Sequence, residues 1–414
     1  MRITKSIRLL FCAIGLYGTS LAQDIEDANK LKTDFTDKGL QFTKGDNFLL
    51  NFRFRTQLRA GYYSRTDDVD EHGFEGMVRR FRLRFEGHLL SPKLEYKLQL
   101  SFSKRDMDLD SGDPQIVRDA VFYYNPNKYW SLGLGQTKLP GNRERVNSSG
   151  ELQMPDRSIA NSKFTLDRDF GIFINRQIAI QKQVIQLQTA ISTGDGRGQV
   201  SVDKGLAYTG RIEYLPFGEF KNKGHYFEGD LEFEETPKLS LGLTYSKNFR
   251  ANRTGGQLGK HMYSTYDEEE ALYANIRTII ADAMFKYNGW AFMGEYFDRK
   301  VDDFSVKDFS DRPDDLVTFL KMPAGKAINV QGSKMVSKKD EIVIRYTQIK
   351  PHKEVALYQY RMATKAIGYS HYFNKHKIKL QGYLGLDDRM GDSDELDDPF
   401  KNRVNGMIQL EIGI

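Results

Sequence analysis

The stretch FLLNFRFRTQLRAGY at residues 48–62 decides the fold of this chain. Apolar side chains occupy nearly all of its even positions, whereas most odd positions from Asn51 to Arg59 carry polar or basic ones. Successive side chains of a β-strand point to opposite faces. The period of two therefore predicts a strand with one apolar face and one basic face.

The same alternation recurs along the chain. In the next segment Phe81, Leu83 and Phe85 oppose the basic positions between them. Segments of this kind are predicted at residues 47–63, 78–90, 94–104, 118–125, 129–138, 168–177, 183–193, 206–215, 238–249, 272–287, 290–300, 326–333, 340–349, 361–373, 376–388 and 402–414. Sixteen strands of this length exceed the usual size of soluble strands and match tilted membrane strands.

The lengths of the links between these segments alternate. Long polar links follow the odd-numbered strands, at residues 64–77, 105–117, 139–167, 194–205, 250–271, 301–325, 350–360 and 389–401. Short turns such as Ser91-Pro92-Lys93 and Asn288-Gly289 follow even-numbered strands, and the link 216–237 is the exception. Outer-membrane barrels have short periplasmic turns and long outer loops. We therefore predict an all-β fold, a sixteen-stranded antiparallel transmembrane β-barrel over residues 47–414.

The orientation of the two faces separates this barrel from a soluble one. Sixteen strands enclose a lumen too wide for apolar side chains to fill, so we expect the polar face to line water and the apolar face to meet lipid. Closure also removes the sheet edges that hydrocarbon would penalise. The alternative is a secreted soluble β-sandwich array or lectin, with the apolar face inside.

The N-terminus predicts export. Arg2, Lys5 and Arg8 precede the apolar run 9–18 and the small-x-small site that ends at Ala22, so residues 1–22 are expected to be a signal peptide. Residues 23–46 are expected to form a periplasmic segment. The single cysteine lies in the leader, which excludes disulfides from the exported chain. Removing the leader's three positive charges from the formal net charge of +5 leaves +2, so any functional charge must be local.

Composition narrows the class further. Apolar residues make up 39% of the chain and charged residues 28%, and mean hydropathy is -0.57. Beyond the leader no apolar stretch approaches eighteen residues, which excludes a helical membrane protein.

Three segments resemble the phosphate-selective porin O/P family. They are RRFRLRFEG at 79–87 with the strand that follows, GLGQTKLP at 133–140, and the run 143–171, which contains Asn147-Ser148-Ser149 and ends FTLDRDFG. The likeness is strong over residues 48–175 and looser beyond. The resemblance implies a sixteen-stranded trimeric outer-membrane barrel that passes anions, with the long loop after the fifth strand folded into the pore.

Two groups of basic residues are the candidate anion-binding and pore-lining site. The first is a strip on the first two strands: Arg53, Arg55, Arg59, Arg80, Arg82 and Arg84. Alternate residues of a strand lie about 6.8 Å apart. Arginine at mid-membrane on the lipid face would cost roughly 2–4 kcal/mol, which directs these side chains inward. The alternative is that Glu86, Glu95 and other lumen acids neutralise the strip.

The second group belongs to the loop 139–167 and the start of the next strand. Its members are Arg143, Arg145, Arg157, Lys163 and Arg168. Basic groups in a narrow passage concentrate anions. The alternative is a solvated external loop.

The remaining motifs point to no further chemistry. Asp106, Asp108 and Asp110 open like a calcium loop, but Val117 occupies the position of the closing Glu. The acidic stretches 67–71 and 387–398 are predicted outer-loop charge, with divalent bridging to lipopolysaccharide as an alternative. His, Ser and Gly residues form no catalytic or phosphate-binding pattern. We expect no enzyme activity, cofactor, resident metal or nucleic-acid partner.

The sequence thus predicts a passive porin in the outer membrane of a Gram-negative bacterium, surrounded by outer-membrane lipid and assembled as a homotrimer. Its expected solutes are small anions, with phosphate and polyphosphate as candidates. Two alternatives stay open: a general or glycan-uptake porin without anion preference, and a structural or docking barrel.

Overall fold

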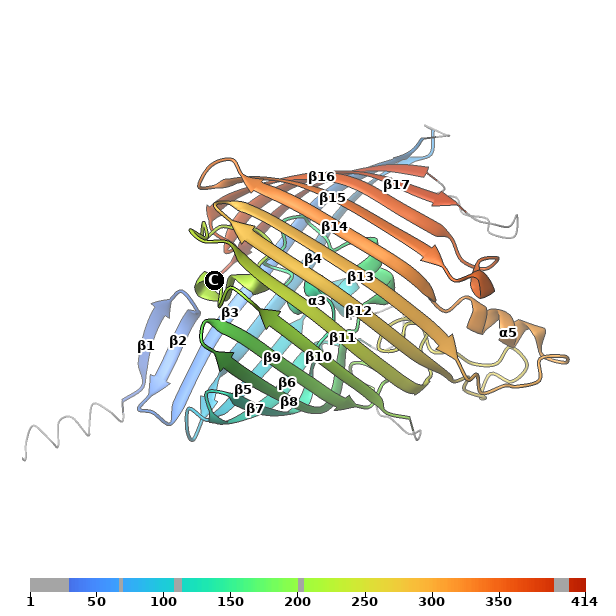
Figure 1. Ribbon diagram of the computed structural model, residues 1–414, viewed down its shortest axis with the longest axis horizontal. Helices are drawn as coiled ribbons and strands as arrows, with labels where there is room; N and C mark the ends of the chain where they lie inside the picture. Colours follow the sequence, from blue (N-terminus) through green and yellow to red (C-terminus); the bar gives the residue numbers. More distant parts are fainter. Residues whose placement is uncertain (1–29, 67–69, 108–113, 200–204, 391–401) are drawn as a thin grey trace, which may run out of the picture.

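The protein forms a closed antiparallel β-barrel of sixteen strands, β3–β18, in which each strand pairs with its neighbours in the chain (Figure 1). The computed structural model describes residues 30–66, 70–107, 114–199, 205–390 and 402–414. The barrel strands are β3 (Phe48–Arg65), β4 (His72–Leu89), β5 (Leu94–Ser101), β6 (Val117–Asn127), β7 (Trp130–Lys138), β8 (Arg168–Ile180), β9 (Gln183–Ser192), β10 (Ala207–Leu215), β11 (Lys238–Ala251), β12 (Ala274–Tyr287), β13 (Trp290–Asp302), β14 (Gly325–Met335), β15 (Asp340–Pro351), β16 (Arg361–Asn374), β17 (Ile378–Met390) and β18 (Asn402–Gly413). All sixteen predicted strands are confirmed, with ends shifted by a few residues.

The last strand closes the barrel against the first. β18 pairs with β3 from Arg403↔Arg65 to Gly413↔Arg55. The first residues of β3 pair instead with a hairpin formed by β1 (Lys32–Thr36) and β2 (Gly39–Lys44). β2 pairs with β3 as far as Lys44↔Phe48. The polar segment 23–46 therefore contains a hairpin that its weak alternation did not reveal. The expected signal peptide, residues 1–22, lies outside the described residues.

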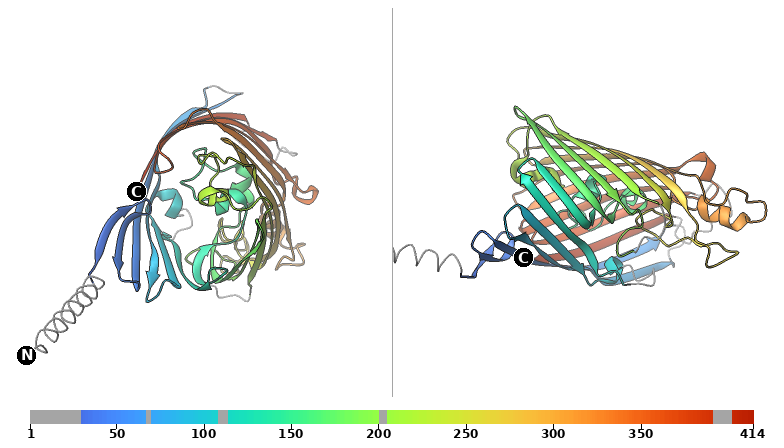
Figure 2. Two further views of the ribbon diagram at one scale, coloured as in Figure 1. Left: turned by 60° about the vertical axis from the view of Figure 1, so that its left-hand side comes forward. Right: turned by 90° about the horizontal axis from the view of Figure 1, so that it is seen from below.

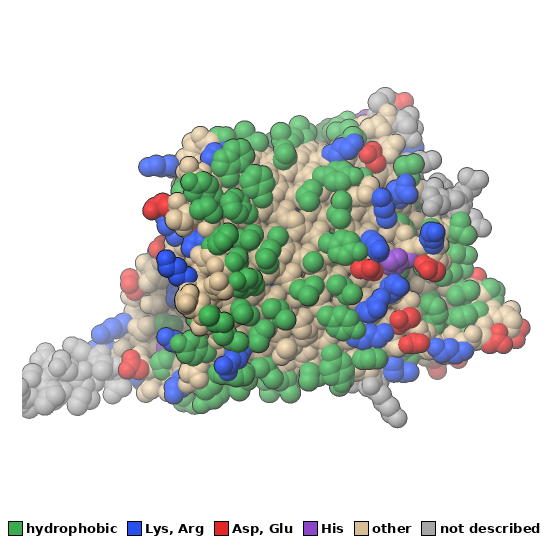
Figure 3. Space-filling model, viewed as in Figure 1, with side chains coloured by type: hydrophobic (Ala, Val, Ile, Leu, Met, Phe, Trp, Pro, Cys, Tyr) green, Lys and Arg blue, Asp and Glu red, His purple; other side chains and the backbone are tan. Residues whose placement is uncertain are grey.

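The apolar face of the barrel points outward. Large apolar side chains such as Leu134, Ile344 and Ile408 are more than half exposed, whereas the polar residues between them are buried. Figure 3 shows apolar side chains over the outer face of the strands, with charged ones gathered toward the two ends. This pattern confirms the membrane orientation and excludes the soluble sandwich.

Long and short links alternate as predicted, but the length of one link needs correction. The link 64–77 was predicted too long: β3 runs to Arg65 and β4 begins at His72, so the hairpin extends past the expected ends. Tyr62 and Phe74 hold this extension together, with ring centroids 5.0 Å apart. The outer links carry short helices at α2 (Lys104–Met107), α5 (Pro313–Leu320) and η3 (Lys353–Val355).

Two long segments fold into the barrel. The loop 139–167 carries α3 (Arg143–Val146) and α4 (Ile159–Phe164), and the link 216–237 carries η2 (Lys221–Tyr226). Figure 2 shows both inside the ring of strands. The predicted inward folding of the 139–167 loop is thus confirmed. Among the described residues no helix is long and apolar enough to cross a membrane.

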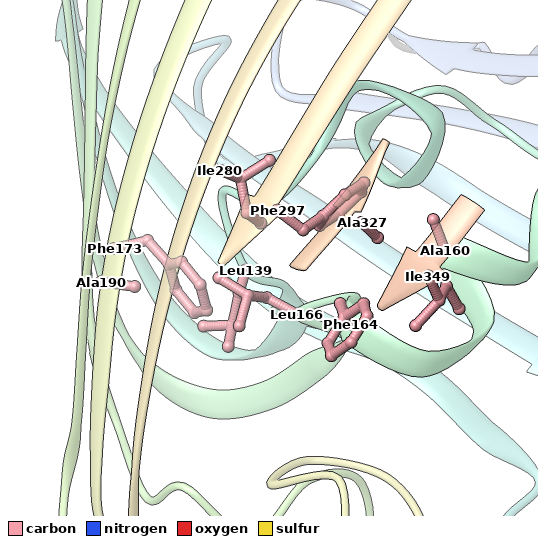
Figure 4. Packing of buried hydrophobic residues seen from close by; sticks show 10 residues of the cluster. All are labelled: Leu139, Ala160, Phe164, Leu166, Phe173, Ala190, Ile280, Phe297, Ala327 and Ile349. Atoms are coloured by element: carbon pink, nitrogen blue, oxygen red, sulfur yellow. The ribbon is translucent and has the colours of Figure 1, made fainter. Parts of the chain in front are cut away.

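An apolar cluster inside the lumen anchors the 139–167 loop. Leu139, Phe164 and Leu166 pack against apolar side chains of the barrel wall (Figure 4). Their wall partners are Phe173, Ala190, Ile280, Phe297, Ala327 and Ile349. Because this cluster joins the loop to both sides of the barrel, it fixes the loop across the lumen.

Candidate pore constriction

The predicted arginine strip exists as facing positions on β3 and β4. Arg53 pairs in register with Arg84, and Arg55 pairs with Arg82. The register shifts between Gln57 and Leu58, so that Arg79 is the extra residue of a bulge. Like charges that face each other across strands are destabilising, so this wall requires acidic or polar partners.

The outer end of the strip is bound to the 139–167 loop through one carboxylate. Asp156 accepts from Arg59 Nη1 at 2.5 Å, from Arg79 Nη2 at 2.9 Å and from Arg80 Nη2 at 3.0 Å. Burial opposes ionisation of Asp156, but the charges of Arg79, Arg80 and Arg59 outweigh it and hold its pKa far below the usual range. Asp156 therefore stays ionised and neutralises part of the outer strip.

The middle of the strip is held by hydroxyl groups and a second acid. Arg55 Nη2 donates to Ser149 Oγ at 2.7 Å, and Arg82 Nη1 donates to the same oxygen at 2.7 Å. Arg82 Nε also donates to Asp106 at 2.5 Å, and Asp106 further pairs with Arg118. Asp106 is thus an inner ion-pair partner and not part of a calcium loop, while Asp108 and Asp110 lie outside the described residues.

The periplasmic end of the strip lines a cavity of about 500 Å³. Arg53 and Arg84 both pair with Glu86, and with Arg55 they remain partly exposed to this cavity. Neutralisation by Glu86, one of the two acids named for that alternative, is therefore observed.

A second group of cations lies where the 139–167 loop meets strands β5–β8. This basic cluster consists of Lys97, Arg118, Lys138, Arg145, Arg157 and Arg168, each within electrostatic range of others. Arg168 pairs with Asp119 at 3.1 Å, and Arg145 pairs with Asp167. The structure thus brings Arg145 and Arg168 together at Asp167.

The basic cluster holds more cations than paired acids. Its ion pairs within the described residues run to only three carboxylates, those of Asp106, Asp119 and Asp167. Lys138 Nζ donates instead to the backbone oxygens of Val146 and Asn147, at 3.2 and 3.0 Å.

The members of the basic cluster on the 139–167 loop also lack acidic partners or have unused donors. Arg157 donates to backbone oxygens of Glu144 and Asn147. Burial and the charges of Arg168, Arg157 and Arg118 lower the pKa of Arg145. The buried side-chain amide of Asn147 has no hydrogen-bond partner among the described residues. The cluster therefore offers unused donors and holds more cations than ion-paired carboxylates.

Two predicted site residues lie apart from the basic cluster. Arg143 is fully buried and pairs with Glu213 at 2.7 Å and Asp282 at 3.1 Å on the opposite wall. Burial opposes its ionisation, but Glu213 and Asp282 raise the pKa of Arg143 above its ordinary value. Lys163 is exposed on α4. Arg143 thus fastens the loop to the wall.

The opposite wall is rich in acids. Its carboxylates are Glu213, Asp282, Glu295 and Glu341 on the strands, with Glu144 on the loop and Glu228 on the link 216–237. The link meets the loop here: Arg143 Nη1 donates to His225 O at 3.0 Å, and Gln153 N donates to Glu228 at 2.9 Å. These acids lie beside the buried cations Arg211, Lys286, Arg299 and Arg345, so the wall carries both signs. We call it the acidic wall for its carboxylates.

Several residues of this site escaped the sequence prediction. Arg79 could have been found, because two adjacent arginines break the alternation and indicate a bulge. Lys97 could also have been found, because it lies on the polar face of the predicted strand 94–104. Asp156 and Arg118 gave no signal of their own, because their roles depend on contacts between distant segments. Among the described residues no group of three or more His, Cys, Asp or Glu side chains is placed to hold a metal ion.

Comparisons with known proteins agree with this architecture. The family model described as phosphate-selective porin O and P matches residues 50–306. An anion-selective porin from Comamonas acidovorans is similar at TM-score 0.53 and 11% identity, covering 88% of this chain and 99% of that one. The channel DcaP of Acinetobacter baumannii gives TM-score 0.53 at 12% identity, covering 88% and 97%. OmpF of Salmonella typhi, in complex with daunomycin, gives TM-score 0.53 at 12% identity, covering 89% and 98%. None of the curated protein sequences compared with the chain matches it.

Proposed function

The chain belongs to the phosphate-selective porin O and P family, and on that premise we propose that its pore prefers small anions, with phosphate and polyphosphate as candidate solutes. The family and the barrel support an outer-membrane channel of a Gram-negative bacterium and favour a channel over an enzyme. Export by the leader at residues 1–22 and assembly as a homotrimer are part of the same proposal.

The observation that carries the anion preference is the charge surplus of the basic cluster. Its six cations share three paired carboxylates at the level where the 139–167 loop narrows the lumen. Cations in a confined, low-dielectric passage raise the local concentration of anions. Lys138 and Arg157 matter most, because neither forms an ion pair with a carboxylate among the described residues and both donate to backbone oxygens.

The periplasmic end of the arginine strip also supports the passage of anions. Arg53, Arg55 and Arg84 line the cavity below the constriction, where a partly exposed guanidinium fork can bind phosphate or carboxylate oxygens. The outer end of the strip has a different role, because Asp156 engages Arg59, Arg79 and Arg80 together. We infer that the outer arginines hold the loop while the inner ones face the solute.

A general porin without anion preference is the second candidate. The acidic wall around Glu213, Asp282 and Glu295 favours it, because carboxylates beside the passage attract cations. Two of these acids, Glu213 and Asp282, are nevertheless engaged by Arg143 and Arg211. The basic cluster has the weaker internal compensation, which is why we favour the anion channel.

Reversal potentials of the purified channel in a salt gradient test this proposal. Lys138→Gln keeps a donor for the two backbone oxygens and removes one positive charge. The interaction energy between two unit charges 4 Å apart in water is about 1 kcal/mol. Loss of the Lys138 charge should therefore lower the anion-to-cation permeability ratio about fivefold at 0.01 M salt.

Lys334→Gln is the matched control. Lys334 Nζ also donates to a backbone oxygen, that of Asn288 at 2.8 Å, but it lies over the exposed ring of Trp290 on the outer face of the barrel. We expect a clearly smaller change there. Equal changes in both variants, or a cation-selective wild-type channel, would contradict the proposal.

A further inference from the structure

A second cavity, of about 560 Å³, opens at the periplasmic end of strands β6–β9. Its inner wall is formed by neutral hydrogen-bonding side chains. We call these the amide wall: Asn125, Ser131, Asn175, Gln177, Gln186 and Gln188. The neighbouring positions Phe122, Leu132 and Ile174 are exposed on the outer face, so the alternation turns the amide wall toward the lumen.

The strand pairing arranges these groups in rows. Ser131 pairs with Asn175, which pairs with Gln188, and Gln177 pairs with Gln186. Adjacent strands lie about 4.8 Å apart, so donors and acceptors repeat at that spacing across the wall. An amide both donates and accepts, and a sugar presents several hydroxyl groups that do the same, whereas inorganic phosphate at neutral pH carries only one or two.

The groups of the amide wall are only partly used by the protein. Gln177 Nε2 donates to Glu219 at 2.9 Å, and Tyr226 Oη donates to Gln186 at 2.9 Å. Within the described ranges the side chains of Asn125 and Asn175 make no hydrogen bond. Tyr226, from the link 216–237, also supplies an aromatic face to the same cavity.

The charge of this cavity does not repel anions. Lys93, Lys128 and Lys223 line it together with the acids Glu95 and Glu219. The amide wall lies on strands whose outer ends carry Lys138 and Arg168 of the basic cluster, seven residues further along β7 and β8. Seven residues of strand span about 24 Å, so a solute meets the two regions one after the other.

We propose that the amide wall binds the hydroxyl-bearing body of the solute, so that this channel takes up anionic sugars, such as sugar phosphates or sugar acids. This inference rests on the anion preference proposed above and names its solute class. The basic cluster attracts the charged group, and the amide wall then retains the hydroxyl groups. Phosphate alone uses the first region only.

The test is the block of ionic current through single channels by three probes: glucose 6-phosphate, glucose and inorganic phosphate. Glucose 6-phosphate should bind more tightly than either of the others. In the variant Asn175→Ala/Gln188→Ala, the affinities for glucose 6-phosphate and glucose should fall about fivefold for each amide lost, while that for phosphate stays. Gln348→Ala, which removes an amide from the outer face of β15, is the control and should change none of them.

The outcomes separate the two proposals. If glucose 6-phosphate binds no better than phosphate, or if the amide variant leaves it unchanged, the amide wall does not select sugars and the anion channel stands. If glucose binds and loses affinity in the amide variant while the channel shows no anion preference, the anion proposal fails and the amide wall remains a sugar site.

Discussion

Replacing Asp156 by Asn should strengthen anion selectivity while loosening the 139–167 loop. Three guanidinium groups converge on this carboxylate, from Arg59, Arg79 and Arg80, at 2.5, 2.9 and 3.0 Å. Asparagine keeps one acceptor oxygen and removes the charge, so the lumen gains one positive charge and three arginines lose their shared partner. No other residue of the loop neutralises this end of the strip among the described contacts.

The structure sets the size of both effects. A unit charge 4–8 Å from a passing anion is worth about 0.5–1 kcal/mol in water, so the anion-to-cation permeability ratio should rise about two- to fivefold at 0.01 M salt. The rise should nearly vanish at 1 M, where the screening length is about 3 Å. Hydrogen bonds to charged groups contribute about 1.5–3 kcal/mol each when buried. Asp156 is 28% exposed and Asn replaces part of the contact, so we expect a loss of about 2–4 kcal/mol in loop anchoring.

The assay combines reversal potentials with single-channel conductance. A rise in selectivity at nearly constant conductance indicates that only the charge has changed, whereas a several-fold larger conductance indicates that the loop has left the lumen. Asp302→Asn removes the same charge from the outer end of β13, where Asp302 pairs with Lys247 at 3.0 Å, and should leave selectivity unchanged. Unchanged or reduced anion preference at 0.01 M in a folded Asp156→Asn channel would refute this account of the strip.

Two further predictions concern the segments folded into the lumen. His225 is buried without a hydrogen-bond partner on its ring among the described residues, and burial lowers its pKa from 6.5 to about 4. Because its folded-state pKa is depressed, neutral His225 contributes its full stabilisation of the folded barrel above pH 6.5, and the free energy of unfolding falls as pH drops toward about 4. The heat-modification temperature in detergent should decrease over this window. The decrease should be smaller in His225→Phe. Phe164→Ala should cost about 3–5 kcal/mol of loop anchoring, because Phe164 is fully packed in the lumen cluster. The same assay should detect a lower heat-modification temperature there, and no comparable loss in Phe170→Ala, whose ring is on the exposed outer face.

The strands were predictable because the barrel imposes one simple rule on them. Every residue between two lipid-facing positions must face the lumen, so alternation alone marks stretches such as 48–62 and 402–414. Closure of β18 on β3 follows once sixteen strands are counted, since an open edge is excluded in hydrocarbon. The hairpin 32–44 was not predicted, because it lies beyond the barrel, where no contact with lipid requires its side chains to alternate.

The candidate site was less predictable, since it forms between segments. The sequence places Arg59 and Arg80 on the lumen face, but nothing local shows that Asp156 will cross the barrel to meet them. Likewise, Arg143 and Arg145 are two positions apart yet engage opposite walls, because α3 turns their side chains in different directions. Ion pairs across a lumen are properties of the folded loop, and periodicity carries no information about them.

The two inward segments also explain why the passage should run along one side of the barrel. The 139–167 loop is fastened to the acidic wall through Arg143 and to β3 and β4 through Asp156, and the link 216–237 supports it from the periplasmic side through His225 and Glu228. These contacts engage the acidic wall and the outer arginines Arg59, Arg79 and Arg80. The inner arginines of β3 and β4 and the inner face of β5–β9 are left to line the passage. A solute that follows β5–β9 meets the basic cluster first and the neutral hydrogen-bonding groups of the amide wall afterwards. That order suits a channel that gathers anions by long-range attraction and then sorts them by short-range contact, because attraction acts over the screening length whereas hydrogen bonds require contact.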